Sequence, residues 1–512
     1  MARYAAVDIG SNSVRMMAAD VGSDGHTQIL AEDRHVTRLG AGVFADGHIS
    51  SAALQFVCGE LVRMGRDFRR LEISSLRAVA TSAVRDAANQ AEFLERTQAA
   101  LGAPVEIISG QEEARLIHLG VQARWPHPKG RILIIDVGGG STELIIGDHG
   151  QFLQAYSKPL GAVRLTGAFL SNDPPAGREL HRMMEYIDEK LADPAANLHG
   201  PFDRVIATSA TAAALVCAAN QVPRPRRHHA DRLSATTGQV RDLYRKFSHA
   251  DLAARRGMTG VGPQRAELIV AGSAVFLRTL EAFGEGALHY SMGGVRDGII
   301  ADLAERGASR ERAQLGAAQR TVVEDMARHY GVQLPHVRQV AWLAGELFKS
   351  LHGLHGLPPH YGKLLEAAAY LHDIGHFVSN TGHHKHSYYL VASSDLPGFT
   401  GAERNFIAWL CRYHRRARPD PSHAFFQTVK PTERDAVILL TPLLRLADSL
   451  DRSHEQRVHE IDVQSRGRQV AIRLRANGAP PQDIDLEVWA AQRNSDLFRE
   501  TFQASLALEA KV

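Results

Sequence analysis

The sequence predicts an α/β protein that consists of two related domains, followed by an all-helical domain and a small α+β tail. Strand and helix patterns alternate up to about Ala308, which is typical of α/β architecture. The following region has apolar residues at helical spacing, and alternating segments return after Val458. At about 100–200 residues per domain, 512 residues indicate three or four domains. We predict domains at residues 1–125, 126–305, 306–456 and 457–512.

A strand, a glycine- and serine-rich turn and a second strand occur twice in the first 150 residues. Residues 4–8, 9–13 and 14–20 form the first copy, and residues 132–136, 137–142 and 144–147 form the second. The acids at the ends of the two leading strands align with each other, as do the serines that close the two turns. This internal duplication predicts two related domains that face each other.

Composition and charge exclude several classes of protein. No apolar run reaches the roughly 18–20 residues that cross a bilayer, and the start does not resemble a secretion signal. The three cysteines lie far apart, which favours buried thiols in a reducing compartment over disulfides or a zinc site. The net charge is only +3, so a nucleic-acid partner is not expected. We therefore expect a cytoplasmic protein without a membrane partner.

The two glycine-rich turns are the strongest indication of chemistry. Glycine lets backbone N–H groups approach a phosphate closely, and the hydroxyls of Ser13, Ser141 and Thr142 add donors. Asp8 and Asp136 end the leading strands, where a carboxylate can hold Mg²⁺. A single turn of this kind is usually only a hairpin, whereas two copies with matched acids favour a phosphate site.

A general base that activates water is expected near these turns. Glu112 and Glu113 lie in the first turn of a predicted helix, although acids at that position also serve only to complement the helix dipole. Glu143, directly after the second turn, is the other candidate, and its side chain is expected to point away from that of Thr142. Thr81 and Arg85 suit an incoming phosphate; the alternative is that Ser82 only caps a helix and Arg85 faces solvent.

Several segments resemble the exopolyphosphatase/guanosine pentaphosphate phosphohydrolase family, within the superfold of actin, hexokinase-type sugar kinases and heat-shock ATPases. The matching segments are residues 6–13, 80–85, 107–116, 135–144 and 291–298, with later stretches at 386–390, 394–399 and 412–416. The resemblance implies that Glu113 is the general base and that Asp136 and Glu143 organise Mg²⁺ and the attacking water. The phosphate-binding residues that we expect are Asn12, Ser13, Thr81, Arg85, Gly138, Gly139, Gly140, Ser141 and Thr142.

One segment departs from the family pattern. The family usually has a glycine-containing phosphate turn after the strand predicted at residues 204–206, and this chain reads Ala207-Thr-Ser-Ala-Thr211 there. The hydroxyls remain, but an alanine replaces a glycine. Close approach of the backbone to a phosphate is therefore in question at this turn.

The helical domain contains the adjacent histidine and aspartate typical of the HD phosphohydrolase superfamily, which it resembles. We expect a divalent-metal set of His336, His372, Asp373 and Asp448, extended toward a second ion by His386 and His414. Three readings remain open: a purely structural domain, metal binding without important turnover, and a second hydrolytic centre. The histidines at positions 383 and 384 are expected to lie in a solvated loop.

We predict an exopolyphosphatase that uses Mg²⁺ to remove the terminal phosphate from inorganic polyphosphate. Removal of the 5′-γ-phosphate from guanosine pentaphosphate is the alternative reaction, and a nucleotide-sensing binding protein with weak turnover is the alternative of another class. The basic runs at residues 224–229 and 412–418 are either solvated faces or surfaces for a polyanion. We expect Arg412, Arg415 and Arg416 to line a polyanion channel, and the resemblance implies a homodimer.

Overall fold

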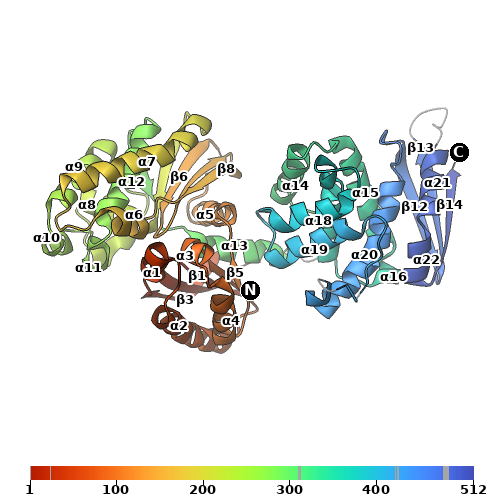
Figure 1. Ribbon diagram of the computed structural model, residues 1–512, viewed down its shortest axis with the longest axis horizontal. Helices are drawn as coiled ribbons and strands as arrows, with labels where there is room; N and C mark the ends of the chain where they lie inside the picture. The colour runs from red at the N-terminus through yellow and green to blue at the C-terminus, as the bar shows by residue number, and fades with distance from the viewer. Residues whose placement is uncertain are drawn as a thin grey trace. The chain divides into compact units, whose positions relative to one another are not determined.

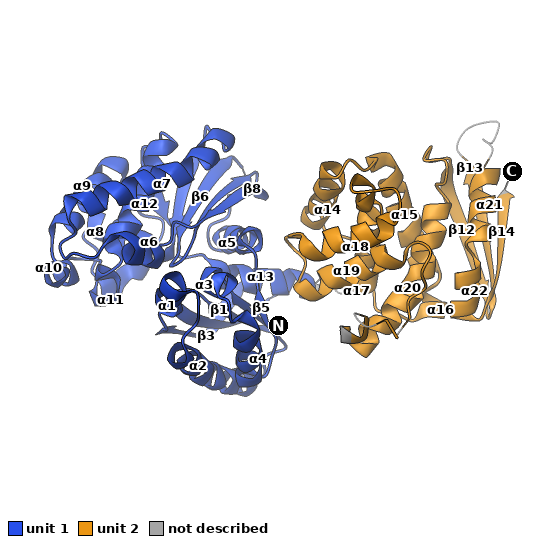
Figure 2. Ribbon diagram, in the orientation of Figure 1, with its two compact units in different colours: residues 1–307 blue, residues 308–512 orange. Residues whose placement is uncertain are grey.

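The structure is a computed structural model that describes residues 2–22, 25–127, 129–308, 313–420, 422–423, 426–476 and 484–511. The chain forms two compact units, Met1–Gly307 and Ala308–Val512 (Figures 1 and 2). Among the described residues, no helix combines the length and apolar character that a membrane crossing requires.

The first half of unit 1, which we call lobe I, contains a five-stranded mixed sheet in the order β3-β2-β1-β4-β5. Its strands are β1 (Ala2–Ile9), β2 (Ser13–Val21), β3 (Thr27–Val36), β4 (Ser75–Ala80) and β5 (Val105–Ile107). Its helices are α1 (Leu39–Asp46), α2 (Ser51–Arg70), α3 (Ser82–Asp86) and α4 (Gln90–Leu101). Helix α2 buries an apolar stripe at helical spacing, which explains why the sequence pattern located it.

The second half, lobe II, repeats this arrangement around the sheet β10-β11-β9-β6-β7-β8. Its strands are β6 (Arg131–Val137), β7 (Thr142–Asp148), β8 (Gln151–Lys158), β9 (Arg204–Thr208), β10 (Ser234–Thr236) and β11 (Ala287–Tyr290). The order β8-β7-β6-β9-β11 matches β3-β2-β1-β4-β5 strand for strand. The duplication that the two turns indicated therefore extends to the topology of both sheets.

Helices cover lobe II, and two more helices join the lobes. Those of lobe II are α6 (Ala162–Phe169), α7 (Gly177–Asn197), α8 (Ser209–Ala219), η1 (Arg224–Ala230), α9 (Thr237–His249), α10 (Leu252–Gly257), α11 (Pro263–Ala266) and α12 (Ile269–Ala282). The joining helices are α5 (Gly110–Arg124) and α13 (Val295–Ala308). Helix α13 follows lobe II in the sequence but packs Ile299 and Leu303 against Tyr4 of lobe I.

Helices α5 and α13 meet at a crossing that only glycine permits. A Cβ atom on Gly298 would lie 1.8 Å from the carbonyl oxygen of Leu116, and one on Gly120 would lie 2.1 Å from that of Gly294. Both distances are far below van der Waals contact, so any side chain would force the two backbones apart. The crossing determines how closely α5 and α13 approach each other. It thereby helps to position the residues at the start of α5.

Unit 2 begins with helices, as the sequence predicts, and ends in a three-stranded sheet. The helices are α14 (Ala317–His329), α15 (Leu334–Ser350), α16 (His352–His355), α17 (His360–Leu371), η2 (Ile374–Phe377), α18 (His383–Ser393), α19 (Gly401–Tyr413), η3 (Phe426–Thr428), α20 (Pro431–Ser449), α21 (Asp485–Arg493) and α22 (Asp496–Phe502). The strands are β12 (Val458–Arg466), β13 (Gln469–Ala476) and β14 (Ser505–Lys511). Leu440 of α20 and Ile472 of β13 belong to one continuous hydrophobic core.

Candidate functional site

The two glycine-rich turns have the same backbone geometry. In lobe I the N–H of Gly10 donates to the carbonyl of Ser13 at 3.0 Å, and in lobe II the N–H of Gly138 donates to the carbonyl of Ser141 at 3.0 Å. Each turn joins the first two antiparallel strands of its sheet. The two copies in the sequence are therefore equivalent hairpins.

The two hairpins lie against each other within unit 1. A Cβ atom on Gly139 would lie 3.0 Å from the Cβ of Ser11, and one on Gly140 would lie 2.5 Å from the hydroxyl oxygen of Ser82. Neither glycine has a positive φ, so close approach, and not backbone conformation, requires glycine at these positions. The sequence pattern did not indicate this reason, because the contacting residues belong to the other lobe.

Strand register brings one arginine and three acids to the hairpins. Asp8 lies opposite Arg15 in the first hairpin, and Asp136 lies opposite Glu143 at the equivalent position of the second. Ser157 of β8 donates its hydroxyl hydrogen to Glu143 Oε1 at 2.8 Å. The equivalent pair of positions thus holds an aspartate and an arginine in lobe I, but two acids in lobe II.

Glu113 of α5 adds a fourth carboxylate to this group. The residue is 8% exposed, and its Oε2 has no hydrogen-bond partner among the described residues. Nη1 of Arg85 lies 3.5 Å from that oxygen. Burial raises the pKa of Glu113 well above its ordinary value, and the nearby charges of Glu143, Asp8 and Asp136 raise it further.

The other three acids near the hairpins also have raised pKa values. Burial, and then the charge of Glu143, raises the pKa of Asp136 to about 7. Burial likewise raises the pKa of Asp8 and of Glu143, although Arg15 opposes the first shift and the Ser157 hydrogen bond opposes the second. The four carboxylates, which we call the acid cluster, carry more negative charge when ionised than the neighbouring arginines balance. Such a group of oxygen ligands suits a hard divalent cation.

Glu112, the neighbour of Glu113, belongs to a different environment. It pairs with Arg115 at 2.8 Å and with Arg77 at 3.0 Å, and both arginines also pair with Asp302 of α13. These pairs hold the pKa of Glu112 and that of Asp302 below their ordinary values, despite burial. The structure therefore distinguishes the two glutamates between which the sequence pattern left the choice open.

The predicted phosphate ligands of lobe I lie around the first hairpin and α3. The carbonyl of Asn12 accepts from the N–H of Thr37 at 3.1 Å, and the Ser13 hydroxyl accepts from Nε of Arg15 at 3.2 Å. Thr81 precedes α3 and makes no side-chain cap hydrogen bond. Arg85 donates to the carbonyl of Ile108 at 2.6 Å, which holds its guanidinium beside Glu113.

Thr142 does not fit its predicted role. Its side chain is fully buried, and its hydroxyl donates to the carbonyl of Leu160 at 2.8 Å, so it offers no donor to a phosphate. As the strand alternation predicted, Thr142 and Glu143 point to opposite faces of β7. The two side chains reach different partners, Leu160 and Ser157 respectively.

An arginine that the sequence analysis missed connects the two lobes. Nε of Arg164 in α6 donates to the carbonyl of Gly140 at 2.9 Å, and its Nη2 pairs with Asp86 of α3. The guanidinium also lies 3.9 Å from the ring centroid of Phe44. A single arginine inside a helical pattern carries no sequence signal, so only the packing of the lobes identifies it.

The turn that departs from the family pattern joins β9 to α8. Its hydroxyls are used internally: Thr208 donates to the carbonyl of Gly293 at 2.6 Å, and Thr211 accepts from Arg265 at 3.3 Å. Ser209 has a φ of 94°, a conformation that favours glycine. The turn therefore holds a strained residue at the start of α8, which is a frequent property of ligand-binding segments.

Unit 2 brings the predicted first metal set together. One ligand atom from each of His336, His372 and Asp373 lies within 4.8 Å of the others. Oδ1 of Asp448 is 3.7 Å from Nε2 of His336 and 3.5 Å from Nε2 of His372. Both of these Nε2 atoms are buried and have no hydrogen-bond partner among the described residues.

The second group around Asp373 differs from the prediction. Nε2 of His376, of His383 and of His414 lies 3.5–3.6 Å from Oδ1 of Asp373. Among the described side chains, His386 makes no contact with this group. The expectation of a solvated loop at residues 383–384 is wrong, because both histidines are buried in the first turn of α18.

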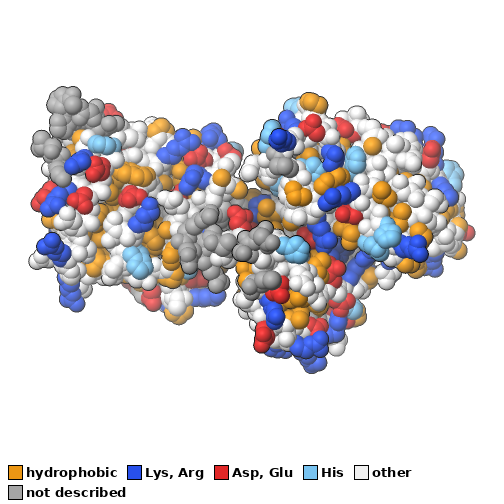
Figure 3. Space-filling model, turned by 180° about the vertical axis from the view of Figure 1, so that it is seen from behind, with side chains coloured by type: hydrophobic (Ala, Val, Ile, Leu, Met, Phe, Trp, Pro, Cys, Tyr) orange, Lys and Arg blue, Asp and Glu red, His pale blue; other side chains and the backbone are white. Residues whose placement is uncertain are grey.

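The basic run after α19 is partly solvated. Arg415 and Arg416 are exposed, whereas Arg412 is half-buried. On the face shown in Figure 3, side chains of both charge signs are interspersed over each unit. That face carries no field of a single sign, in agreement with the low net charge of the sequence.

Comparison with protein families identifies the chain. The model of the Ppx/GppA phosphatase family matches residues 19–307, and the model of Ppx/GppA phosphatase, domain III, matches residues 318–492. The chain belongs to the Ppx/GppA phosphatase family. Glu113, Asp136, Glu143 and the second hairpin lie within the phosphatase match, whereas the turn of the first hairpin precedes residue 19.

Relatives of this Ppx/GppA family member cover most of its length. A Vibrio parahaemolyticus protein named guanosine-5′-triphosphate,3′-diphosphate pyrophosphatase is 29% identical over 417 residues, which are 80% of each chain. The crystal structure of the Aquifex aeolicus family member is 30% identical, with a TM-score of 0.53 over 60% of this chain and 98% of that one. An exopolyphosphatase from Cytophaga hutchinsonii, 23% identical, shares the fold with a TM-score of 0.54 over 59% of this chain and 98% of that one.

Proposed function

We propose that this protein hydrolyses the terminal phosphoanhydride bond of a highly phosphorylated substrate, either inorganic polyphosphate or guanosine pentaphosphate. The observation that carries the proposal is Glu113, a buried carboxylate of the acid cluster beside the paired hairpins, whose Oε2 lies 3.5 Å from Arg85 and has no hydrogen-bond partner among the described residues. The phosphatase family of the chain supports hydrolysis, and the name of the Vibrio relative supports the nucleotide.

The residues of the acid cluster suit direct attack by water. Glu113 takes a proton from the water, whose oxygen forms a bond to the terminal phosphorus while the bridging P–O bond breaks. The products are inorganic phosphate and a substrate shortened by one phosphate. Arg85 and the backbone N–H groups of the two hairpins hold the phosphoryl oxygens.

Magnesium fits the donor set of the acid cluster. The pKa values of all four carboxylates are raised, because the groups are buried and few cations lie near them. A bound divalent ion would balance their negative charge. Asp136 and Glu143, which lie opposite each other in the second hairpin, would hold the ion. When bound, Mg²⁺ would neutralise phosphate charge.

Phosphate release from long-chain polyphosphate and from guanosine pentaphosphate, with and without Mg²⁺, tests this function. We expect Mg²⁺-dependent release from at least one substrate, and competition between the two at a common site. Glu113→Gln removes the base and should lower the rate of release by about 10²–10⁴ while substrate binding persists. A Glu113→Gln variant as active as the parent would show that Glu113 is not the base. It would favour the alternative of a nucleotide-sensing binding protein with weak turnover.

We propose a second centre, a divalent-metal site in unit 2 related to the HD phosphohydrolases. The specific observation is the pair of buried Nε2 atoms of His336 and His372, which have no hydrogen-bond partner among the described residues and lie 3.5–3.7 Å from Oδ1 of Asp448. Their Nδ1 atoms are held at 2.8 Å by Asp451 and by the Ala369 carbonyl, an arrangement that orients the free nitrogen toward a ligand. Asp373 and Asp448 would complete the set.

Metal analysis of the purified protein tests the second centre. The parent should retain a divalent transition metal after gel filtration, and the His372→Ala/Asp373→Ala variant should lose it. Equal metal content in both would refute the site. If the variant also lost phosphate release while remaining folded, the main activity would belong to unit 2 and not to the acid cluster.

Two further expectations are part of the proposal. Arg415 and Arg416, with the half-buried Arg412, would attract a polyanionic substrate, so that Arg415→Ala/Arg416→Ala should weaken binding of long polyphosphate more at low salt than at high salt. We also propose a homodimer, which light scattering coupled to gel filtration tests.

A further inference from the structure

Helix α5 is followed by a tryptophan that two arginines contact. Cζ of Arg204 lies 4.6 Å from the ring centroid of Trp125, and Cζ of Arg232 lies 5.6 Å from it. Two imidazole rings pack against the same indole, that of His127 at 4.8 Å and that of His289 at 6.1 Å. We call these five residues the tryptophan cluster. Basic groups from four separate segments of the chain thus surround one aromatic ring.

The fold of lobe II explains why these residues meet. Residues two apart on a strand share a face of the sheet, so Arg204 lies on the face of Ile206, which belongs to one hydrophobic cluster with Ile117 of α5. His289 of β11 is the neighbour of Ile206 in the register. Helix α5 therefore packs on this face, and Trp125, which follows its last residue, reaches Arg204 at the beginning of β9.

The tryptophan cluster lies at the opposite end of α5 from the acid cluster. Glu113 is in the first turn of α5 and Trp125 follows the helix, and at a rise of about 1.5 Å per residue the two are about 18 Å apart along the axis. Arg204 begins β9, whereas Asp136 pairs with that strand at its last residue. The tryptophan cluster is therefore remote from the proposed reacting centre.

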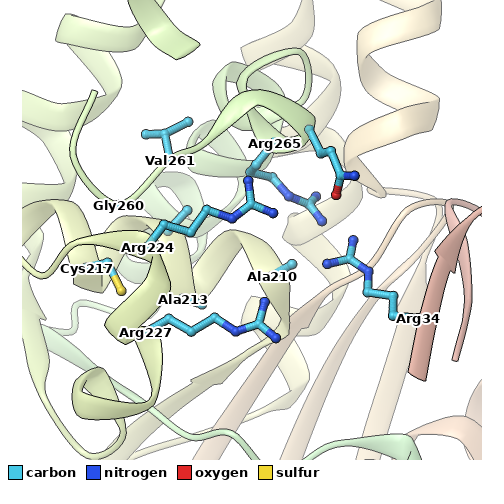
Figure 4. Close-up of a pocket in the computed structure, with 11 residues that line it drawn as sticks. Arg34, Ala210, Ala213, Cys217, Arg224, Arg227, Gly260, Val261 and Arg265 are labelled. Atoms are coloured by element: carbon cyan, nitrogen blue, oxygen red, sulfur yellow. The ribbon is translucent and has the colours of Figure 1, made fainter. Parts of the chain in front are cut away.

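The tryptophan cluster is also separate from the pocket that Figure 4 shows. That pocket is lined by arginines of other segments, Arg34, Arg224, Arg227 and Arg265. Its lining, within the described part of the chain, includes no member of the tryptophan cluster. The basic run at residues 224–229 thus contributes to that pocket, and the tryptophan cluster is a second concentration of basic groups in unit 1.

The two arginines of the tryptophan cluster have no carboxylate within salt-bridge distance among the residues that the structure describes. Nη1 of Arg204 lies 3.1 Å from Nε2 of His127, and Nη2 of Arg232 donates to the carbonyl of Arg124 at 3.1 Å. Arg124, in contrast, pairs with Asp297 at 2.7 Å. A guanidinium has five N–H groups, so both arginines retain donors for an anion.

The basic groups of the tryptophan cluster oppose one another. Burial lowers the pKa of His127, and the charges of Arg204 and Arg232 lower it further. Burial and the charge of Arg204 also lower the pKa of His289. The φ of Arg232 is 67°, a left-handed conformation that favours glycine. Strain and like charges held together are typical of sites that receive a ligand of the opposite charge.

We propose that the tryptophan cluster binds a compact phosphate dianion, either inorganic phosphate or a phosphate monoester. Guanidinium N–H groups match phosphate oxygens, and two guanidinium groups around one ring suit an anion of this size. The inference goes beyond the proposed function, because it assigns an anion site that takes no part in hydrolysis. It can be tested without turnover, so its failure and that of the proposed function are distinguishable.

Trp125 provides a probe of its own site. The other three tryptophans, Trp342, Trp409 and Trp489, belong to unit 2. Titration of the full-length protein with inorganic phosphate should change its tryptophan fluorescence in a saturable manner, because the emission of an indole responds to charges beside the ring. Sodium chloride at matched ionic strength should not produce this change, and the Trp125→Phe variant should lose it.

Removing the two arginines tests which groups bind the anion. Arg204→Gln/Arg232→Gln should raise the half-saturating phosphate concentration about tenfold or more. Arg204→Lys should bind more tightly than Arg204→Gln because it keeps the charge. Arg241 provides a matched control in the same lobe, because it pairs with Glu281 at 2.9 Å, and Arg241→Gln should bind within about twofold of the parent. Unaltered thermal unfolding verifies that the variants are folded.

Further arms of the titration separate the tryptophan cluster from the reacting centre and identify its ligand. Arg85→Ala alters the reacting centre and should leave the response of Trp125 as in the parent; loss of the response would overturn a separate site. Glycerol phosphate distinguishes a monoester from the free ion, and saturation by either supports the proposal. No saturable response in the parent, an equal response in the double variant, or a response to tripolyphosphate alone would overturn it.

Discussion

Glu112 and Glu113 are adjacent and buried to a similar extent, but their surroundings are opposite. Glu112 faces α13 and forms a closed network with Arg77, Arg115 and Asp302, which holds the helix in place. Glu113 faces the hairpins, where acids outnumber the cations that contact them. The difference teaches that one helix turn serves two purposes: Glu112, held by two arginines, stabilises the fold, and Glu113, near one arginine and three other acids, is available for chemistry.

Replacing each glutamate by glutamine, its neutral isostere, is the strongest test of this difference in role. Glu113→Gln is expected to lower kcat for phosphate release by about 10²–10⁴, with little loss of stability. Glu112→Gln is expected to lower the free energy of unfolding by about 3–5 kcal/mol, because it leaves buried charges uncompensated. Phosphate-release kinetics and denaturant unfolding measure the two effects. A catalytic loss in Glu112→Gln that equals that of Glu113→Gln would contradict the division.

The two environments also predict opposite responses to pH. Asp136 has a pKa of about 7 in the folded protein and 3.8 ordinarily, so its protonated form stabilises the fold and that stability is lost as the pH rises from about 4 to about 7. Asp136→Asn should therefore raise the melting temperature of metal-free protein at pH 8. Glu112, whose pKa is lowered, contributes stability above its ordinary pKa that is lost on acidification.

Thermal unfolding between pH 4 and pH 8, in buffer that contains a chelator, measures how the contributions of Asp136 and Glu112 to stability depend on pH. Added Mg²⁺ should stabilise the parent at pH 8 more than the Asp136→Asn variant, since an ion that binds the folded state shifts unfolding by mass action. Equal stabilisation of the two proteins would argue against Asp136 as a metal ligand.

A smaller effect is expected where a hydrogen bond moderates the acid cluster. Ser157→Ala removes the donor to Glu143, which helps to lower the pKa of that carboxyl. The acid limb of the pH–rate profile should therefore move to higher pH, while kcat on the plateau falls far less than in Glu113→Gln. An acid limb at the parent position would show that the pKa of Glu143 does not control it.

Much of the fold was predictable because its signals are local. The repeated hairpins, the helical face of α2 and the helix that begins at Gly110 each follow from spacing within one segment. The duplication predicted two related domains, but the order of strands in each sheet was not predicted. Strand β3 and helix α1 were not predicted, since β3 is largely exposed or half-buried and has no buried alternation.

The candidate site was only partly predictable because it depends on contacts between distant segments. Arg164 is an ordinary residue in the sequence, and its role appears only where α6 meets the second hairpin and α3. His383 belongs to a polar run that resembles a solvated loop, but helix packing buries it beside Asp373. Residues that ligate or repel one another across a fold leave no spacing pattern.

The glycine crossing of α5 and α13 has a consequence for any search that ranks positions by intolerance to substitution. Gly120, Gly293 and Gly298 would rank with the reacting residues in a saturation-mutagenesis screen, although the backbone of the opposing segment leaves each of them no room for a methyl group. An alanine there would shift the carboxylate at the start of α5 without changing any group that contacts substrate. To separate these glycines from the residues that take part in the reaction, such a screen must score the amount of folded protein and its turnover independently.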